Sequence, residues 1–264
     1  MCGQVGFVFG THRDRGGWTA HLHHLRQLFT NLLVANEARG KDATGLGWMG
    51  PDGDTHILKT TQLASEWVST LDFASFMRLF NRDSAALVGH TRWPSNKTAP
   101  ILDCDNQPLQ VGSIWGTHNG TVYNADELFQ QWGLPRNATV DSEILFQLAY
   151  QHLRDGRFQV ADYLRALAPI RGQYSGIMLN STQSDMAWLV RGNKPISIWL
   201  HVEWDVVLFT SLAAHAKPYR LQANGWQKIE VPVMTCLEFD RNDLQLYKCH
   251  AFDIHRETQA SDPP

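Results

Sequence analysis

The chain enters a strand almost at its first residue, and this constrains the fold more than any other feature of the sequence. Residues 4–9, QVGFVF, form a short apolar run with β-branched and aromatic members, which is typical of a buried strand. Cys2 stands close in front of this run. Because a terminus built into a sheet does not fray, the sequence predicts that the first side chains are held in place.

Cys2 also follows Met1 directly, and methionine aminopeptidase removes an initiator methionine when the next side chain is small. We therefore expect the mature chain to begin with a cysteine that carries a free α-amine. The ordinary pKa of a cysteine thiol is about 8.5 and that of an α-amine is about 8. An N-terminal amine can therefore act as the base for a nucleophile on its own residue. Taken alone, the position of Cys2 favours an accident of the second codon, because a single cysteine is a weak signal.

The composition predicts a cytosolic globular protein. The 264 residues are 43% hydrophobic and 19% charged, enough for one large or two small domains. The net charge is −3 and no cluster of Lys and Arg is present, which argues against nucleic-acid or membrane-surface partners. We identify no signal peptide and no apolar run of about 20 residues that would span a bilayer.

Cysteine and histidine spacing gives no metal signal. Cys2, Cys104, Cys236 and Cys249 are far apart and form no CxxC pair, so reduced thiols are expected. The histidines at positions 21, 23 and 24 have no acidic or cysteine third ligand nearby, which favours solvent-exposed side chains. We expect no metal and no cofactor.

Hydrophobic periodicity predicts helices and strands in separate layers of a single domain, residues 2–250, followed by a polar tail, 251–264. Residues 94–112 are rich in Pro, Asn, Asp and Gly and are predicted to form a loop. The last third alternates strands and turns, which favours an antiparallel meander. Predicted helices cover about 19–38, 61–70, 72–80, 124–132 and 141–154, and predicted strands carry the segments QVGFVF, ATGLGWM, HILK, ALVGHTRW, SIWGTHNG, YSGIMLN, MAWLVRG, ISIWL, DVVLFTS, VMTCLEF and LQLYKC.

Five segments, in order, resemble a known family. MCGQVGFVF, NEARGKDATGLGW, GHTRW, HNGTVYN and VDSEIL match the order and spacing of the class II glutamine amidotransferase domain, as in the glutaminase half of glucosamine-phosphate synthase. The resemblance covers about residues 2–210. It implies an α+β fold, the four-layer αββα sandwich of N-terminal nucleophile hydrolases, with two mainly antiparallel sheets between helix layers.

The resemblance implies three catalytic groups. Cys2 would attack the side-chain amide of glutamine. The side-chain amide of Asn119 and the backbone N–H of Gly120 would form the oxyanion hole, where loss of one donor typically costs on the order of 3 kcal/mol. Without the family, Asn-Gly would be interpreted as a hairpin turn.

Substrate binding and support of the nucleophile are implied at further positions. Arg92 would grip the α-carboxylate through two charge-assisted bonds, and Asp141 would receive the α-ammonium. Asp141 also fits a helix N-cap, and both roles can coexist. Trp93 either walls the pocket or packs beside a strand end. The resemblance also implies that the RG-x-D-x-x-G segment supports the nucleophile, where Arg39, Gly40, Asp42 and Gly45 would orient Cys2 and hold the turn.

One departure and three functional hypotheses remain. After Trp93 the family has Ala-Thr-His-Gly, whereas this chain has Pro94, Ser95, Asn96 and Lys97, so the loop that covers glutamine differs. The favoured hypothesis is a glutamine amidohydrolase that forms a γ-glutamyl thioester on Cys2 and supplies ammonia to a separate synthase subunit, because roughly 50 residues after the resemblance are too few for a synthase domain. The alternatives are an amidohydrolase of a γ-glutamyl metabolite and a non-catalytic regulatory domain that kept the fold.

Overall fold

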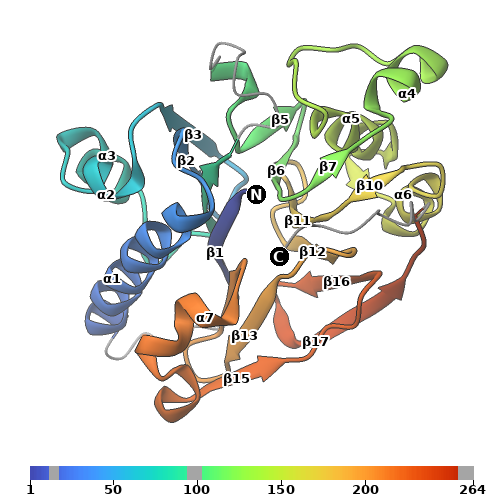
Figure 1. The fold of residues 1–264 in the computed structure, drawn as a ribbon. Helices are drawn as coiled ribbons and strands as arrows, with labels where there is room; N and C mark the ends of the chain where they lie inside the picture. The colour runs from blue at the N-terminus through green and yellow to red at the C-terminus, as the bar shows by residue number, and fades with distance from the viewer. Residues whose placement is uncertain (12–17, 94–102, 255–264) are drawn as a thin grey trace.

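The computed structural model of the chain describes residues 1–11, 18–93 and 103–254. Two sheets pack face to face in its centre, and helices cover their outer sides (Figure 1). Every strand pairing within the two sheets is antiparallel. The predicted α+β, four-layer αββα sandwich is therefore confirmed.

The first sheet carries the N-terminal strand at its centre, with the order β15-β13-β14-β1-β4-β2-β3. Its outer face packs under α1 and the short helices that follow, seen at the left of Figure 1. Phe7 of β1 contacts Phe29 of α1 within this apolar layer. The elements of this half are β1 (Gly3–Phe9), β2 (Ala43–Met49), β3 (Thr55–Thr60), β4 (Ala86–Arg92), β13 (Ser197–His201), β14 (Val206–Thr210), β15 (Trp226–Ile229), α1 (Trp18–Asn36), α2 (Ala64–Trp67), α3 (Leu71–Met77) and α7 (Ala213–Ala216), with short 3-10 helices η1 (Glu37–Arg39), η3 (Lys217–Tyr219) and η4 (Leu221–Asn224).

The second sheet has the order β17-β16-β12-β11-β6-β5 and packs under α4, α5 and α6 on the opposite flank of the molecule (Figure 1). Two small ribbons, β7 with β10 and β8 with β9, lie outside it. Its elements are β5 (Leu109–Val111), β6 (Ile114–His118), β11 (Ser175–Asn180), β12 (Met186–Arg191), β16 (Thr235–Asp240), β17 (Asp243–Ala251), α4 (Ala125–Trp132), α5 (Glu143–Gln151) and α6 (Val160–Ala166), and the accessory elements are β7 (Thr121–Val122), β8 (Leu153–Arg154), β9 (Arg157–Phe158), β10 (Gly172–Gln173) and η2 (Asp103–Asp105).

The layer between the sheets is a separate apolar core, and side-chain alternation assigns residues to it. On β1, Val5, Phe7 and Phe9 face the helices, whereas Val8 faces the second sheet. On β6, Trp115 faces the first sheet. The inter-sheet face therefore recurs at every second residue on both strands.

Three predictions about elements are wrong. The strands of the last third do not form one meander, because β13, β14 and β15 join the first sheet and β11, β12, β16 and β17 join the second. The predicted loop contains β5, which pairs with β6. The structure also contains α6, which the sequence analysis did not predict.

Two further observations concern the predicted tail and the membrane. β17 extends to Ala251 and Ile254 is buried in the core, whereas residues 255–264 lie outside the described residues. Among the described residues, no helix combines the length and apolar character needed to cross a membrane.

Candidate active site

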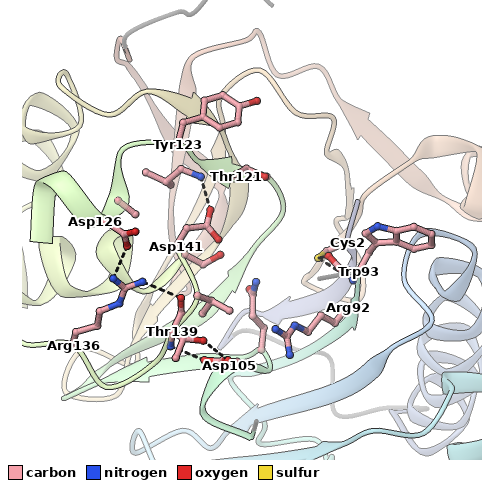
Figure 2. A pocket seen from close by; sticks show the side chains of 16 residues that line it. Cys2, Arg92, Trp93, Asp105, Thr121, Tyr123, Asp126, Arg136, Thr139 and Asp141 are labelled. Atoms are coloured by element: carbon pink, nitrogen blue, oxygen red, sulfur yellow. Dashed lines mark hydrogen bonds and ion pairs between the residues drawn. The ribbon is translucent and has the colours of Figure 1, made fainter. Parts of the chain in front are cut away.

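A pocket of about 380 Å³ opens where strands of both sheets end, and Cys2, Arg92, Trp93, Gly120 and Asp141 of the predicted site residues line it. Cys2 precedes β1, Arg92 ends β4 of the same sheet, and Trp93 follows it. Gly120 follows β6 of the second sheet, and Asp141 stands before α5. Figure 2 shows Cys2, Arg92 and Trp93 on one wall of the pocket and Asp141 on the opposite wall. The volume falls within the range of about 300–1,000 Å³ typical of small-molecule sites.

Cys2 is half-buried and held by backbone groups. Its Sγ accepts a hydrogen bond from the Trp93 N–H at 3.4 Å and lies 3.6 Å from the Trp93 carbonyl oxygen. Arg39 Nε donates to the Cys2 carbonyl oxygen at 2.8 Å. Burial raises the pKa of the Cys2 thiol, against the opposing effects of the Trp93 N–H and of the Arg92 charge. A thiol in this environment is protonated at neutral pH and needs a base to become a nucleophile.

Asn119 presents an amide with nothing bound to it. The side chain is 0% exposed, and among the described residues neither its Oδ1 nor its Nδ2 has a hydrogen-bond partner. Its backbone is fixed, since Asn119 and Ser175 exchange two hydrogen bonds of 2.7 and 3.0 Å. Buried amides are normally paired, and an unpaired one costs about 1–3 kcal/mol. Because the Asn119 backbone is fixed and its Nδ2 has no partner among the described residues, this Nδ2 can donate a hydrogen bond to a ligand oxygen.

Gly120 occupies a position that no other residue fits. Its φ is +152°, and a Cβ there would lie 1.9 Å from the Gln173 carbonyl oxygen. The hairpin interpretation of Asn-Gly is wrong, because β7 pairs with β10 and not with β6. The glycine serves the close approach of two backbones instead.

Arg92 and Asp141 place opposite charges in the same pocket. Arg92 Nη1 donates to Asn106 Oδ1 at 2.7 Å, and the Asp141 carboxylate accepts from the Val122 N–H. Among the described residues, no ion pair links the two side chains. The N-cap interpretation of Asp141 is wrong, since Ser142 is the N-cap residue of α5 and no side chain caps that helix.

The segment that carries Asp141 is held by two further carboxylates. Asp105 accepts from the Thr139 N–H at 2.7 Å and from Thr139 Oγ1 at 2.6 Å. Glu143, also nearly fully buried, accepts from the Ala138 N–H at 2.6 Å. The pocket wall therefore has a fixed shape before any ligand binds.

Three polar residues that sequence analysis did not identify support the site. Gln107 accepts from the backbone N–H of His118 at 2.5 Å and donates to its carbonyl oxygen at 2.9 Å. The His118 ring contacts Ser142 Oγ at 2.8 Å and the Gln173 carbonyl oxygen at 3.0 Å, and burial lowers the pKa of the ring. Asn106 Oδ1 accepts the hydrogen bond from Arg92 Nη1. Asn106 and Gln107 lie in the segment predicted as loop, where nothing in the sequence pattern distinguishes them.

The RG-x-D segment packs against the strand that carries Arg92. A Cβ on Gly40 would lie 2.5 Å from the Arg92 carbonyl carbon, and the Asp42 N–H donates to the Arg92 carbonyl oxygen at 3.0 Å. A Cβ on Gly45 would lie 2.0 Å from the Gln107 carbonyl oxygen. These close approaches join β2 and β4 to the pocket floor.

A second pocket of about 290 Å³ meets the first at Cys2. Trp93, Gly120 and Thr121 line both pockets, and the second also includes Asn119 and Lys194. Trp93 is 41% exposed. It therefore walls the site instead of packing in the core. The departure at Pro94–Lys97 lies outside the described residues.

The site offers no metal ligand set in the described part of the chain. Within residues 1–11, 18–93 and 103–254, no group of three or more His, Cys, Asp or Glu side chains is arranged to hold a metal ion.

Comparisons with known proteins found relatives by sequence and by structure. No protein-family model matches the chain. It is 20% identical over 215 residues to glutamine–fructose-6-phosphate aminotransferase (isomerizing) of Geobacillus kaustophilus, covering 81% of this chain and 32% of the relative. It is 25% identical over 195 residues to 7-cyano-7-deazaguanine synthase of Saccharolobus solfataricus, covering 72% and 40%. The chain thus spans about a third of the length of the first of these relatives.

A solved structure shows the same fold. Glutamine phosphoribosylpyrophosphate amidotransferase from Bacillus subtilis, complexed with ADP and GMP, superposes with a TM-score of 0.66 at 19% identity. The match covers 96% of this chain and 49% of that one. Nearly all of the sandwich is therefore shared with one half of a longer protein.

Proposed function

We propose that this chain, which resembles class II glutamine amidotransferase domains in sequence and has their fold, is a glutamine amidohydrolase. One observation carries the proposal. The unpartnered amide of Asn119 lines the same pocket as the Cys2 thiol, and that pocket is continuous with the one holding Arg92 and Asp141. Cleavage of the side-chain amide of an amino acid requires a nucleophile, an oxyanion donor and groups that bind the charged head group, together with a base for the thiol proton.

The head group of glutamine fits the charged pocket. The planar fork of Arg92 binds the α-carboxylate, and Asp141 binds the α-ammonium. With the head group fixed at these walls, the side-chain amide extends toward Cys2. Holding reacting groups in place in this way contributes a large part of a catalysed rate.

The reaction proceeds through a thioester. The α-amine of Cys2, free once Met1 is removed, takes the thiol proton while Sγ attacks the amide carbon. The Asn119 amide and the Gly120 N–H stabilise the oxyanion. The C–N bond then breaks, and the amine returns the proton to departing ammonia. Water attacks the γ-glutamyl thioester, which releases glutamate and restores the thiol, so glutamine and water become glutamate and ammonia.

We propose that the ammonia passes to a synthase, and a separate subunit is the favoured form of it. The name of the Geobacillus kaustophilus relative describes an aminotransferase that takes its amino group from glutamine, and the match covers 32% of that protein. A subunit that docks over Trp93 and the second pocket would receive the ammonia where it leaves Cys2.

A second candidate is an amidohydrolase of γ-glutamyl amides with a larger amine. The second pocket supports it, because ammonia alone does not need about 290 Å³ beyond the nucleophile. Lys194 lines this pocket, so an amine that carries a carboxylate is the matching leaving group.

A panel of amides tests both candidates. Purified protein is first checked by intact mass for loss of Met1, and then glutamine, γ-glutamyl-methylamide and γ-glutamyl-glycine are compared by glutamate release. We expect glutamine to be the best substrate. Preference for γ-glutamyl-glycine, lost in Lys194→Ala, would select the second candidate. Retained Met1 with no turnover of any amide would instead indicate the non-catalytic domain.

A further inference from the structure

Gln4 is a polar side chain in the middle of an apolar layer. It lies two residues after Cys2 on β1 and is 0% exposed. Because alternate residues of a strand share a face, Gln4 points between the sheets, as Val8 does on the same strand. A buried amide in such a layer is tolerated only when it is hydrogen-bonded.

Both the oxygen and the nitrogen of the Gln4 side-chain amide form hydrogen bonds to the second sheet. Thr117 Oγ1, on β6, donates to Gln4 Oε1 at 2.7 Å. Gln4 Nε2 donates to the carbonyl oxygen of Ser175, on β11, at 3.2 Å, and lies 3.4 Å from Ser175 Oγ. Its backbone is joined to the end of β14, since the Gln4 N–H donates to Ser211 Oγ at 2.8 Å and the Ser211 N–H to the Gln4 carbonyl oxygen at 2.9 Å.

Both partners neighbour Asn119, Thr117 along the chain and Ser175 through hydrogen bonds. Thr117 lies two residues before Asn119, on the β6 face that Trp115 places between the sheets. Ser175 exchanges both of its backbone hydrogen bonds with Asn119. The Ser175 carbonyl oxygen therefore accepts from Asn119 and from Gln4 at once.

The nucleophile and the oxyanion donor come from different sheets. Cys2 precedes a strand of the first sheet, and Asn119 follows a strand of the second. Apolar contact between sheets is non-directional and leaves their relative shift weakly determined. Hydrogen bonds are directional and determine it.

We propose that Gln4 is a positioning residue that sets Cys2 opposite Asn119 by hydrogen-bonding one sheet to the other directly beneath the reacting groups. The inference rests on the proposed function for its kinetic consequence. Its structural part, the coupling of Gln4 to the backbone of Asn119, holds independently of any substrate.

Gln4→Leu tests the kinetic part, because leucine keeps the position apolar and of similar size but removes both inter-sheet bonds. We expect kcat for amide hydrolysis to fall by about 100-fold, the scale of a misplacement of about 1 Å, with KM changed less than threefold. Alkylation of Cys2 by iodoacetamide develops no oxyanion and should keep its wild-type rate. Thr117→Val should lower kcat similarly, and the double variant should lower it no further than the larger single effect.

Val8→Ala is the matched control, since Val8 lies on the same strand and face but outside the polar cluster. It should lower thermal stability without lowering kcat. If Gln4→Leu retains wild-type kcat, or if kcat follows stability in both variants, the positioning role is excluded while the amidohydrolase assignment stands.

Hydrogen exchange tests the structural part without activity. The Asn119 backbone N–H should exchange at least tenfold faster in Gln4→Leu than in Val8→Ala, after both are corrected for global stability. An unchanged exchange rate would overturn the inference even in a protein that turns over no amide. A wild-type protein without turnover, but with the faster exchange, would contradict the proposed function and leave the coupling in place.

Discussion

Two buried asparagines lie at opposite ends of the same strand pair and differ in one respect. Asn119 follows β6 and stands opposite Ser175, whereas Asn180 ends β11 and stands opposite Ile114. Both side chains are 0% exposed. Asn180 donates to the Gly156 carbonyl oxygen at 2.7 Å and accepts from Thr182 Oγ1 at 2.8 Å, while the Asn119 amide has no partner among the described residues.

The difference separates a structural group from one kept ready for a ligand. A satisfied buried amide stabilises the fold, and an unsatisfied one lowers stability until something binds it. Asn106 Nδ2 and His90 Nε2 are also unpartnered within the described chain, and both residues lie close to Arg92. Other unpartnered atoms of the described chain, such as Arg26 Nε on α1 and Trp226 Nε1 on β15, lie on elements away from the site. Asn119 is distinguished from these because both polar atoms of its side chain are unpartnered and because it lines a pocket together with Cys2.

The largest effect should come from Cys2→Ala, which removes the group that Asn119 serves. We expect glutamate release to fall by about four orders of magnitude or more, the scale seen when a nucleophile is deleted. Melting temperature should be nearly unchanged, because Cys2 is only half-buried. Cys104→Ala and Cys249→Ala, at exposed thiols, serve as controls and should retain activity. Activity within tenfold of wild type in Cys2→Ala would end the thioester mechanism.

Asn119→Ala should produce the next largest effect. Loss of one oxyanion donor lowers kcat by about 100- to 1,000-fold, with little change in KM, because the donor acts on charge present only in the transition state. Steady-state kinetics with glutamine measures both constants. Since the described residues make no hydrogen bond to this amide, the free energy of unfolding should not decrease as it does for a paired asparagine. A rise in KM at constant kcat would assign Asn119 to ground-state binding instead.

The hydrophobic pattern of the sequence predicts where helices and strands lie, but it does not predict which strands pair with one another. The apolar run of β1 identifies it because the strand is buried on both faces, and the period of α1 identifies it because one face of the helix packs on the sheet. The strands after Ser175 have similar patterns whichever sheet they join, so their division between two sheets comes from long-range pairing. The Asn-Gly hairpin signal was misleading at 119–120 because β7 pairs with β10.

The candidate site shows the same limit. Cys2, Arg92 and Asp141 were identified because their motifs resemble a family. Gln107 supports the site through bonds to His118, eleven residues along the chain, and Gln4 through bonds to Thr117 and Ser175. Contacts of this kind leave no periodic trace, so only the folded chain reveals them.

Asn180→Ala is the counterpart at the far end of the strand pair. Removing a buried, fully bonded amide should lower the free energy of unfolding by about 1–3 kcal/mol, because the groups it served lose their partners. Urea denaturation measures the change. Activity of the folded variant should equal that of wild type, since Asn180 lines neither pocket. If kcat instead falls as far as in Asn119→Ala, the contrast between the two ends is wrong.

Asp141→Asn tests the charged wall opposite Cys2. The amide keeps an acceptor for the Val122 N–H but loses the negative charge, so the α-ammonium of glutamine is bound less tightly. We expect KM to rise about tenfold, equivalent to about 1.4 kcal/mol, with kcat lowered less than threefold. Glutamine saturation curves measure the change. Asp126→Asn, at an exposed carboxylate paired with Arg136 at the outer rim, is the control. Equal KM values in wild type and Asp141→Asn would exclude the head-group role.

His90 extends the comparison to pH, with the smallest expected effect. Burial lowers the pKa of His90 to about 3, assisted by the nearby charges of Arg92, His118 and Lys59. Its unfolded pKa is about 6.5. Because the folded value is the lower one, the unfolded chain binds the proton first, so stability is complete above about pH 6.5 and declines as pH falls toward 3. One such group accounts for about 1.4 kcal/mol for each pH unit in this window.

His90→Gln removes this titration and isolates its share from that of His118, whose pKa burial also lowers. Urea denaturation at pH 7.0, 6.0 and 5.0 should show a shallower loss of unfolding free energy in the variant, by about 1 kcal/mol between pH 6 and pH 5. Identical slopes in the variant and the wild type would mean that His90 is protonated in the native state and has found a partner. The buried polar side chains near the pocket would then have hydrogen-bond partners as complete as those of Asn180.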